Sequence, residues 1–111
     1  MGPERHGFAL RVKPERIDEY TRFHREVWTE VLEAIREAGI RNYSIFLKED
    51  LLFGYYEYAG PPDEYAQRLE AMAAAPRMRE WWDLMEPMQA PLPTRKEGEW
   101  WSEMEEVFHA D

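Results

Sequence analysis

Tyr20 and His24 lie four residues apart in a segment whose apolar residues recur every three or four positions. That spacing is typical of a helix face turned toward a core, and it puts the phenol and the imidazole on the same face. A buried polar group without a partner costs about 1–3 kcal/mol, so both side chains need polar partners there. We therefore expect a pocket beneath this helix, with His24 transferring a proton near neutral pH. A histidine with a purely structural role is the alternative interpretation.

Two further pairs carry side chains suited to binding a small polar molecule. Asn42 and Tyr43 begin an alternating segment, so one of them should face the helix layer and reach the space near His24. Trp81 and Trp82 are adjacent, and neighbouring residues do not both lie at the centre of one helical face. Indole rings pack against the apolar face of a sugar, so this pair is a candidate pocket wall. An ordinary strand tyrosine and a tryptophan core are the alternatives.

Other catalytic patterns are missing from the sequence. It contains no glycine-rich phosphate loop and no nucleophile elbow. His6, His24 and His109 lie far apart without the spacing of metal ligands, so we expect no metal site. Cysteine is absent, which excludes disulfides and thiolate chemistry. The general base is left unassigned, with a glutamate on the inward face of the last strand as one candidate.

Length and composition indicate one domain covering residues 1–111. The chain is long enough for a single core, and 44% hydrophobic with 33% charged residues is an ordinary globular balance. A net charge of −9 disfavours nucleic acid and anionic membranes as partners, but not a neutral substrate. No apolar run approaches the ~20 residues of a transmembrane helix, and the MGPERHG start lacks the apolar core of a secretion signal. We expect a cytoplasmic protein.

The apolar periodicity predicts alternating strands and helices. The strands are expected at residues 5–12, 41–48, 51–58 and 102–110. The helices are expected from about Pro14 to Ala38, from 63 to 74, and onward from Pro76, with a loop over 89–99. In the last helix, a stripe of Met78, Trp81, Met85 and Met88 has the spacing of a core-facing side.

The order of these elements is β-α-β-β-α-β, with a hairpin through Glu49-Asp50 between the second and third strands. It predicts a ferredoxin-like α+β fold, in which a four-stranded antiparallel sheet carries its helices on one face. The other face still holds apolar side chains. We therefore expect a homodimer that brings two sheets together.

The chain also resembles a known family. The L-rhamnose mutarotases share the segments YTRFHREVWTEVLEAIREAGIRNYSIFL, LFGYYEY, MREWWDLM and MEEVFH, over about residues 6–109. The resemblance implies a cytoplasmic homodimer of the dimeric α/β-barrel type that interconverts the α and β anomers of L-rhamnose without a cofactor. It also implies His24 as the proton donor. The sugar-binding positions that it implies are Tyr20, Tyr43, Trp81 and Trp82.

Two positions depart from the family pattern. Arg25 stands where members tend to have Asn or Asp, and Thr29 stands where they tend to have Pro. We expect Thr29 to remove a helix irregularity, and Arg25 to lower the pKa of His24 or to shift the sugar preference. The same topology also suits a cofactor-free or haem-handling monooxygenase of the dimeric α/β-barrel type, or a non-catalytic ligand-binding barrel.

Overall fold

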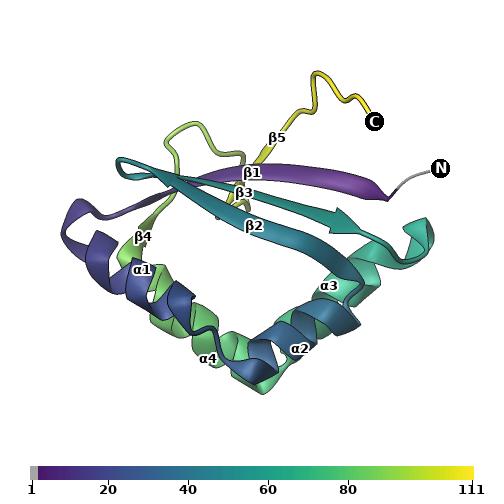
Figure 1. Ribbon diagram of the computed structural model, residues 1–111, viewed down its shortest axis with the longest axis horizontal. Coiled ribbons are helices and arrows are strands. Elements are labelled where there is room, and N and C mark those ends of the chain that lie inside the picture. The colour runs from purple at the N-terminus through teal and green to yellow at the C-terminus, as the bar shows by residue number, and fades with distance from the viewer. Residues whose placement is uncertain (1–2) are drawn as a thin grey trace.

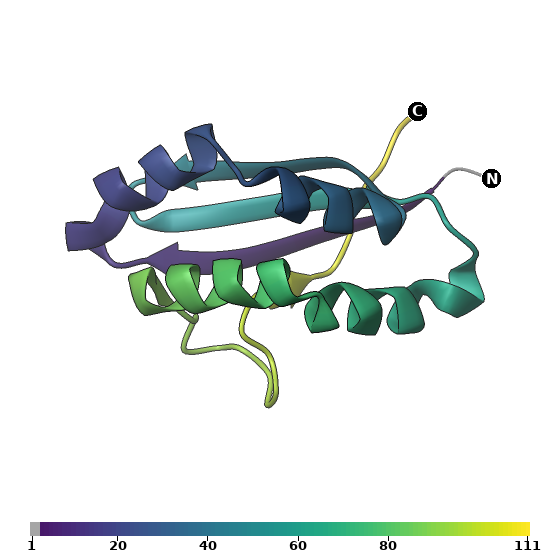
Figure 2. The same ribbon diagram turned by 90° about the horizontal axis from the view of Figure 1, so that it is seen from below.

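The computed structural model describes residues 3–111 as an antiparallel sheet with helices packed against one face (Figures 1 and 2). The elements are β1 Glu4–Val12, α1 Ile17–Arg25, α2 Thr29–Glu37, β2 Ile40–Lys48, β3 Leu51–Tyr58, α3 Tyr65–Ala74, α4 Pro76–Met85, β4 Gln89–Ala90 and β5 Ser102–Met104. Short 3₁₀ helices precede α1 and α3 and follow α4, over Pro14–Arg16, Pro62–Glu64 and Glu86–Met88. The predicted ferredoxin-like α+β fold is confirmed.

The sheet has the strand order β2-β3-β1-β4, and β5 also pairs with β1. The fourth strand predicted over 102–110 is therefore wrong in extent, because only Ser102–Met104 pair with β1. Gln89–Ala90, predicted as loop, form a second short strand along the same edge, opposite Arg11 and Val12. The four-stranded sheet becomes five-stranded because the chain leaves the edge of β1 after β4 and returns to it at β5.

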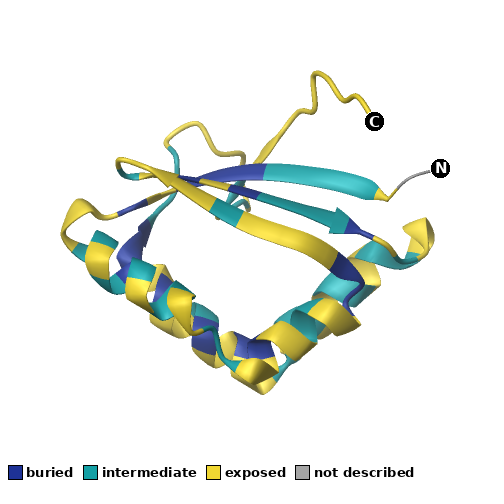
Figure 3. Ribbon diagram, viewed as in Figure 1, coloured by how far each residue is buried: buried dark blue, intermediate teal, exposed yellow. Residues whose placement is uncertain are grey.

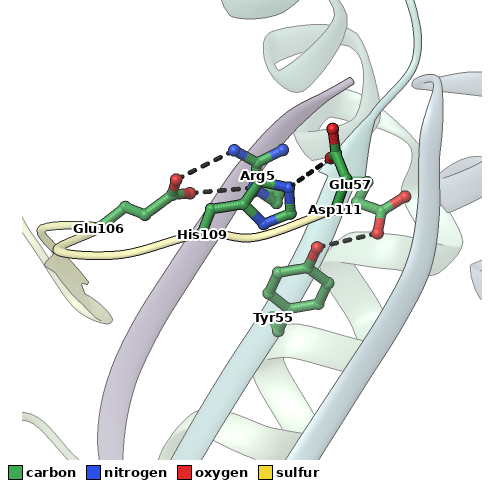
Figure 4. A network of polar contacts seen from close by, with 6 residues as sticks. All are labelled: Arg5, Tyr55, Glu57, Glu106, His109 and Asp111. Atoms are coloured by element: carbon green, nitrogen blue, oxygen red, sulfur yellow. Dashed lines mark hydrogen bonds and ion pairs between the residues drawn. The ribbon is translucent and has the colours of Figure 1, made fainter. Parts of the chain in front are cut away.

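Residues beyond β5 stay close to the sheet through side chains rather than through a backbone ladder. Arg5 donates two hydrogen bonds of 3.0 Å to the carboxylate of Glu106 (Figure 4). On neighbouring β3, Tyr55 donates to Glu57 over 2.8 Å. The exposed pair of Arg5 and Glu106 keeps the C-terminal segment near β1 without extending the strand.

The helix predicted from Pro14 to Ala38 is interrupted. Helix α1 ends at Arg25, where Glu26 turns to φ −139° and ψ 66°, and α2 starts only at Thr29. The expectation that Thr29 would remove a helix irregularity is wrong, because the break persists without a proline. A straight helix over that range would be about 37 Å long, whereas a nine-residue strand spans only about 30 Å. The break lets α1 and α2 take different directions beneath the sheet (Figure 1).

The core lies between the sheet and the helix layer (Figure 3). Its fully buried side chains include Leu10, Val12 and Leu52 from the sheet and Val31 from α2. The predicted stripe on and after α4 is also confirmed as core: Met78, Trp81, Met85 and Met88 are all buried. Within residues 3–111, no helix is long and apolar enough to cross a membrane.

The opposite face of the sheet carries large apolar side chains in contact with solvent. Phe46 on β2 and Phe53 on β3 are directly paired, with ring centroids 6.2 Å apart, and Phe46 is 61% exposed. Leu51 and Met104 add to the same face. The predicted apolar outer face is therefore present. We call this set of four residues the outer patch.

Candidate active site

Two adjoining cavities of about 330 and 250 Å³ open between the helices and the sheet. The residues lining both are His24, Tyr43, Ile45, Trp81 and Trp82, and Tyr20 lines only the smaller one. The structure therefore brings together all the site residues predicted from the sequence. Because the cavities share so much of their lining, we treat them as two compartments of one candidate active site.

His24 lies in the last turn of α1, one helical turn after Tyr20. Its Nδ1 is 2.8 Å from the backbone carbonyl oxygen of Tyr20. A carbonyl oxygen only accepts hydrogen bonds, so Nδ1 must carry a hydrogen and donate it. In the neutral ring, Nε2 is then the nitrogen with a free lone pair. His24 therefore presents a proton acceptor, while its other nitrogen is anchored to its own helix.

Burial lowers the pKa of His24 below its ordinary value, and the hydrogen bond to the Tyr20 carbonyl only partly opposes this. The pKa of His24 is lowered as predicted, but the predicted cause, the cation of Arg25, is wrong. Desolvation of the ring is responsible. The effect of Arg25 on sugar preference stays a prediction. The imidazole is also held by aromatic contacts, stacked 4.3 Å from the ring of Tyr20 and edge-on, 5.4 Å from Trp81.

The phenol of Tyr20 is held by residues from distant parts of the chain. Its ring is 4% exposed, and its hydroxyl accepts a 3.1 Å hydrogen bond from Nε2 of Gln89. Oε1 of Gln89 in turn accepts a 2.8 Å bond from the indole N–H of Trp100. Burial raises the pKa of Tyr20, and the bond from Gln89 opposes that rise.

Tyr43 reaches the cavities because β2 contains a bulge at its start. The pairing with β3 shifts between Arg41 and Ser44, so Asn42 and Tyr43 both lie opposite Tyr56. Asn42 adopts a left-handed φ of 51°, a conformation that asparagine tolerates better than most residues. Its side chain donates to Glu57, whereas Tyr43 lines the cavities with Ile45. Only Tyr43 of the predicted pair therefore reaches the candidate site.

The ring of Tyr43 packs at the junction of the sheet and the cavities. Its centroid is 5.4 Å from that of Tyr56 and 6.0 Å from that of Phe8, both in edge-on contacts. Desolvation raises the pKa of Tyr43, with smaller contributions from Tyr20 and Tyr56. At neutral pH the hydroxyl of Tyr43 is therefore protonated and able to donate a hydrogen bond.

Trp81 and Trp82 both line the cavities, but only Trp81 is also part of the buried core. Trp81 is 6% exposed and packs edge-on against Phe23 and Trp28, with ring centroids 6.2 and 5.2 Å away. Trp82 is only half-buried, as expected for the neighbour that lies off the buried stripe. Both indoles line both cavities. The sequence left open whether this pair belongs to the core or to the pocket wall, and both interpretations are correct.

Sequence reasoning missed several lining residues. Apolar side chains from the helices form most of the wall of the larger cavity, and they include Val27, Val31, Leu32, Ile35, Met72 and Met78. The smaller cavity also has Glu86, Gln89, Trp100 and Trp101. The glutamates of the last strand line neither cavity, so the suggested inward base there is wrong. Trp100 and Trp101 form a second pair of adjacent tryptophans. This pair was the sequence signal that could have identified the loop before β5 as part of the cavity wall.

Comparisons with known proteins agree with this arrangement. The family model described as L-rhamnose mutarotase matches residues 5–110. An L-rhamnose mutarotase from Oceanobacillus iheyensis is 33% identical over 97% of this chain and 99% of its own length. Nothing in these matches favours the monooxygenase alternative.

Two solved structures share the fold. The L-rhamnose mutarotase from Formosa agariphila superposes with a TM-score of 0.75 at 23% identity, over 97% of this chain and 99% of that one. Tetracenomycin F2 cyclase from Streptomyces glaucescens, a polyketide cyclase, superposes with a TM-score of 0.67 at 19% identity over the same shares of the two chains. These likenesses concern architecture, which unrelated chemistries share. The family match over nearly the whole chain is decisive: this chain belongs to the L-rhamnose mutarotase family.

Proposed function

We propose that this protein interconverts the α and β anomers of L-rhamnose. The observation that carries the proposal is the neutral imidazole of His24, whose Nε2 lone pair is free in a cavity walled by Trp81 and Trp82. Membership of the L-rhamnose mutarotase family supports the choice of sugar. The larger cavity, at about 330 Å³, has a volume suited to a small ligand.

The reaction opens the pyranose ring, lets the aldehyde rotate, and closes the ring on the other face. Opening removes the proton of the anomeric hydroxyl, breaks the bond between C1 and the ring oxygen, and adds a proton to that oxygen. Both oxygens are bonded to C1, so one nitrogen can take the proton from the first and give it to the second. Closing reverses both transfers, and the net proton count is unchanged.

His24 is the group suited to this exchange. At rest it is a proton acceptor at Nε2, and after accepting the anomeric proton it becomes the proton donor that the family resemblance implies. This scheme therefore needs neither a metal nor an organic cofactor, since only protons are transferred to and from the sugar and no electrons change hands. A separate general base is unnecessary in this scheme.

The other predicted residues would bind and orient the sugar. Tyr20 and Tyr43 carry hydroxyls at the cavity wall, and their raised pKa values keep both phenols protonated. Trp81 and Trp82 offer indole faces that suit the apolar face of the ring and its C6 methyl group. We propose these four as the substrate-binding residues.

We also propose that two copies pair through the outer patch. Its four members, Phe46, Leu51, Phe53 and Met104, range from 37% to 61% exposed on one face. An apolar surface of this kind typically marks a contact with another protein, and the helices all lie on the other side of the sheet (Figure 1). Sedimentation velocity would report the homodimer, and a monomer at micromolar concentration would refute it.

We further propose a cytoplasmic location. The sequence has no cysteine, and the family to which the chain belongs is named for activity on a free sugar. Fractionation of the native cells followed by immunodetection would test this. Recovery in a membrane or secreted fraction would contradict it.

The direct test is anomer exchange measured by NMR saturation transfer. L-rhamnose at equilibrium is irradiated at one anomeric proton, and loss of signal at the other anomer gives the exchange rate. We expect catalytic amounts of the protein to raise that rate well above the spontaneous one. L-fucose and D-glucose serve as comparison sugars. An unchanged rate with L-rhamnose would refute the proposed function.

A further inference from the structure

A chain of hydrogen bonds enters the candidate site from the loop before β5. The indole N–H of Trp100 donates to Oε1 of Gln89 over 2.8 Å, and Nε2 of Gln89 donates to the hydroxyl of Tyr20 over 3.1 Å. Gln89 is only 7% exposed, and among residues 3–111 it is the one buried residue outside the apolar and aromatic types. Its backbone is fixed because β4 pairs with Val12 of β1.

The direction of this chain follows from its first member. An indole N–H is a donor only, so the amide of Gln89 must turn its oxygen toward Trp100. The amide nitrogen then faces Tyr20, and the phenolic oxygen must act as the acceptor. The proton of the Tyr20 hydroxyl is left free. Among residues 3–111, that hydroxyl has no other hydrogen-bond partner, and Tyr20 lines the smaller cavity.

We propose that Trp100 and Gln89 are positioning residues that make Tyr20 a hydrogen-bond donor toward an oxygen of the bound sugar. The inference rests on the proposed function and adds to it two residues that are not among the predicted site residues. Tyr20 and His24 lie on the same helical face, with ring centroids 4.3 Å apart. One therefore presents a donor and the other an acceptor to neighbouring oxygens of one substrate.

Substitution Gln89→Glu tests this polarity with almost no change of shape. A carboxylate only accepts, so it would accept from both Trp100 and Tyr20 and would draw the phenolic proton away from the cavity. Losing one neutral hydrogen bond to the sugar should lower kcat/KM by about tenfold at neutral pH. When the new carboxyl is protonated it can donate to Tyr20 again. The ratio of variant to wild-type kcat/KM should therefore rise as the pH falls.

The matched control is Gln67→Glu, the same charge change at the other glutamine of the sequence, which is exposed on α3. It should leave kcat/KM unchanged. Tyr20→Phe supplies the second control, because it removes the hydroxyl that Gln89 orients. In that background, Gln89→Glu should cause no further loss. His24 and Glu86 line the same cavity and are unchanged in both backgrounds, so comparing Gln89→Glu with and without the Tyr20 hydroxyl isolates the effect of that hydroxyl.

Trp100→Phe is the second variant, in case a buried carboxylate prevents folding. It keeps an aromatic ring but frees the amide of Gln89 to rotate, so kcat/KM should fall about two- to fivefold, and again only when Tyr20 is present. Two outcomes with an active wild type would overturn this inference and leave the proposed function standing. One is a ratio of Gln89→Glu to wild-type kcat/KM that does not change with pH. The other is an equal loss of kcat/KM with and without the Tyr20 hydroxyl. An inactive wild type would refute the proposed function and this inference with it.

Discussion

The pH dependence of anomer exchange should follow the protonation of His24. Only the neutral ring has a lone pair at Nε2, because Nδ1 donates to the carbonyl of Tyr20. Burial puts its pKa below the ordinary value of about 6.5. L-rhamnose carries no titrating group near neutrality. We therefore expect kcat/KM to be level at neutral pH and to fall by about tenfold per unit below the pKa of His24.

Substitution His24→Gln removes the titrating nitrogen and keeps a polar side chain of similar reach. The loss should be about 10²–10⁴-fold in kcat/KM, the usual contribution of a positioned acid–base group. The residual activity should also lose the acid limb of the profile. Saturation-transfer NMR from about pH 5 to about pH 8 measures both, after subtraction of the spontaneous rate. A wild-type rate that rises as the pH falls, or a variant within threefold of wild type, would refute the reasoning.

The same shift has a consequence for stability, with a definite sign. The unfolded chain binds a proton at His24 at higher pH than the folded chain does, so acidification favours unfolding. The free energy of unfolding is therefore highest above about pH 6.5, the pKa of His24 in the unfolded chain. It decreases as the pH falls from there toward the lower pKa of His24 in the folded chain. His24→Leu should remove this dependence. Urea titrations of both proteins on either side of that window would show whether their stability difference changes with pH.

Four further predictions concern single substitutions in the core, the cavity wall and the outer patch. Trp81→Ala should lower the free energy of unfolding by about 3–5 kcal/mol, because its indole is 6% exposed. Trp82→Ala, at a half-buried position, should mainly raise KM for the sugar; urea titration and kinetics separate the two effects. Gly54→Ala would place a Cβ 2.2 Å from Cε2 of Phe8, an overpacking that should cost about 1–3 kcal/mol, and Phe8→Leu should recover part of that loss. Phe53→Glu should convert the proposed dimer to a monomer in sedimentation velocity.

Periodicity was enough to predict most of the elements but not the break after α1. The residues Tyr20, His24, Val27 and Val31 continue one apolar stripe across the break, because both helices face the same cavity and core. The stripe therefore predicts which side of the chain is buried. It does not predict whether the backbone between α1 and α2 is helical. Here the fit of the helix layer to the length of the sheet outweighs local helix propensity.

The site was predictable where its residues share one element, and less so where distant segments meet. Tyr20 and His24 lie on one helical face, and Trp81 and Trp82 are neighbours on another helix. Gln89 and Trp100 were missed because their role depends on the bond from Gln89 to Tyr20, which is 69 residues away from Gln89 in the sequence, and Trp100 acts through Gln89. The pairing of β4 with β1 creates that contact, and a two-residue strand leaves no periodic signal.

The position of His24 in α1 explains how one side chain can serve both halves of the reaction. Burial favours the neutral ring, which is the form that accepts a proton. The last turn of a helix favours a cation by about 0.3–1 kcal/mol, since unpaired carbonyls point toward it, and the bond from Nδ1 to the Tyr20 carbonyl acts in the same direction. Desolvation is the larger effect, so the resting ring is neutral. The helix end limits the cost of the transient imidazolium, and the same nitrogen can therefore accept the proton and return it.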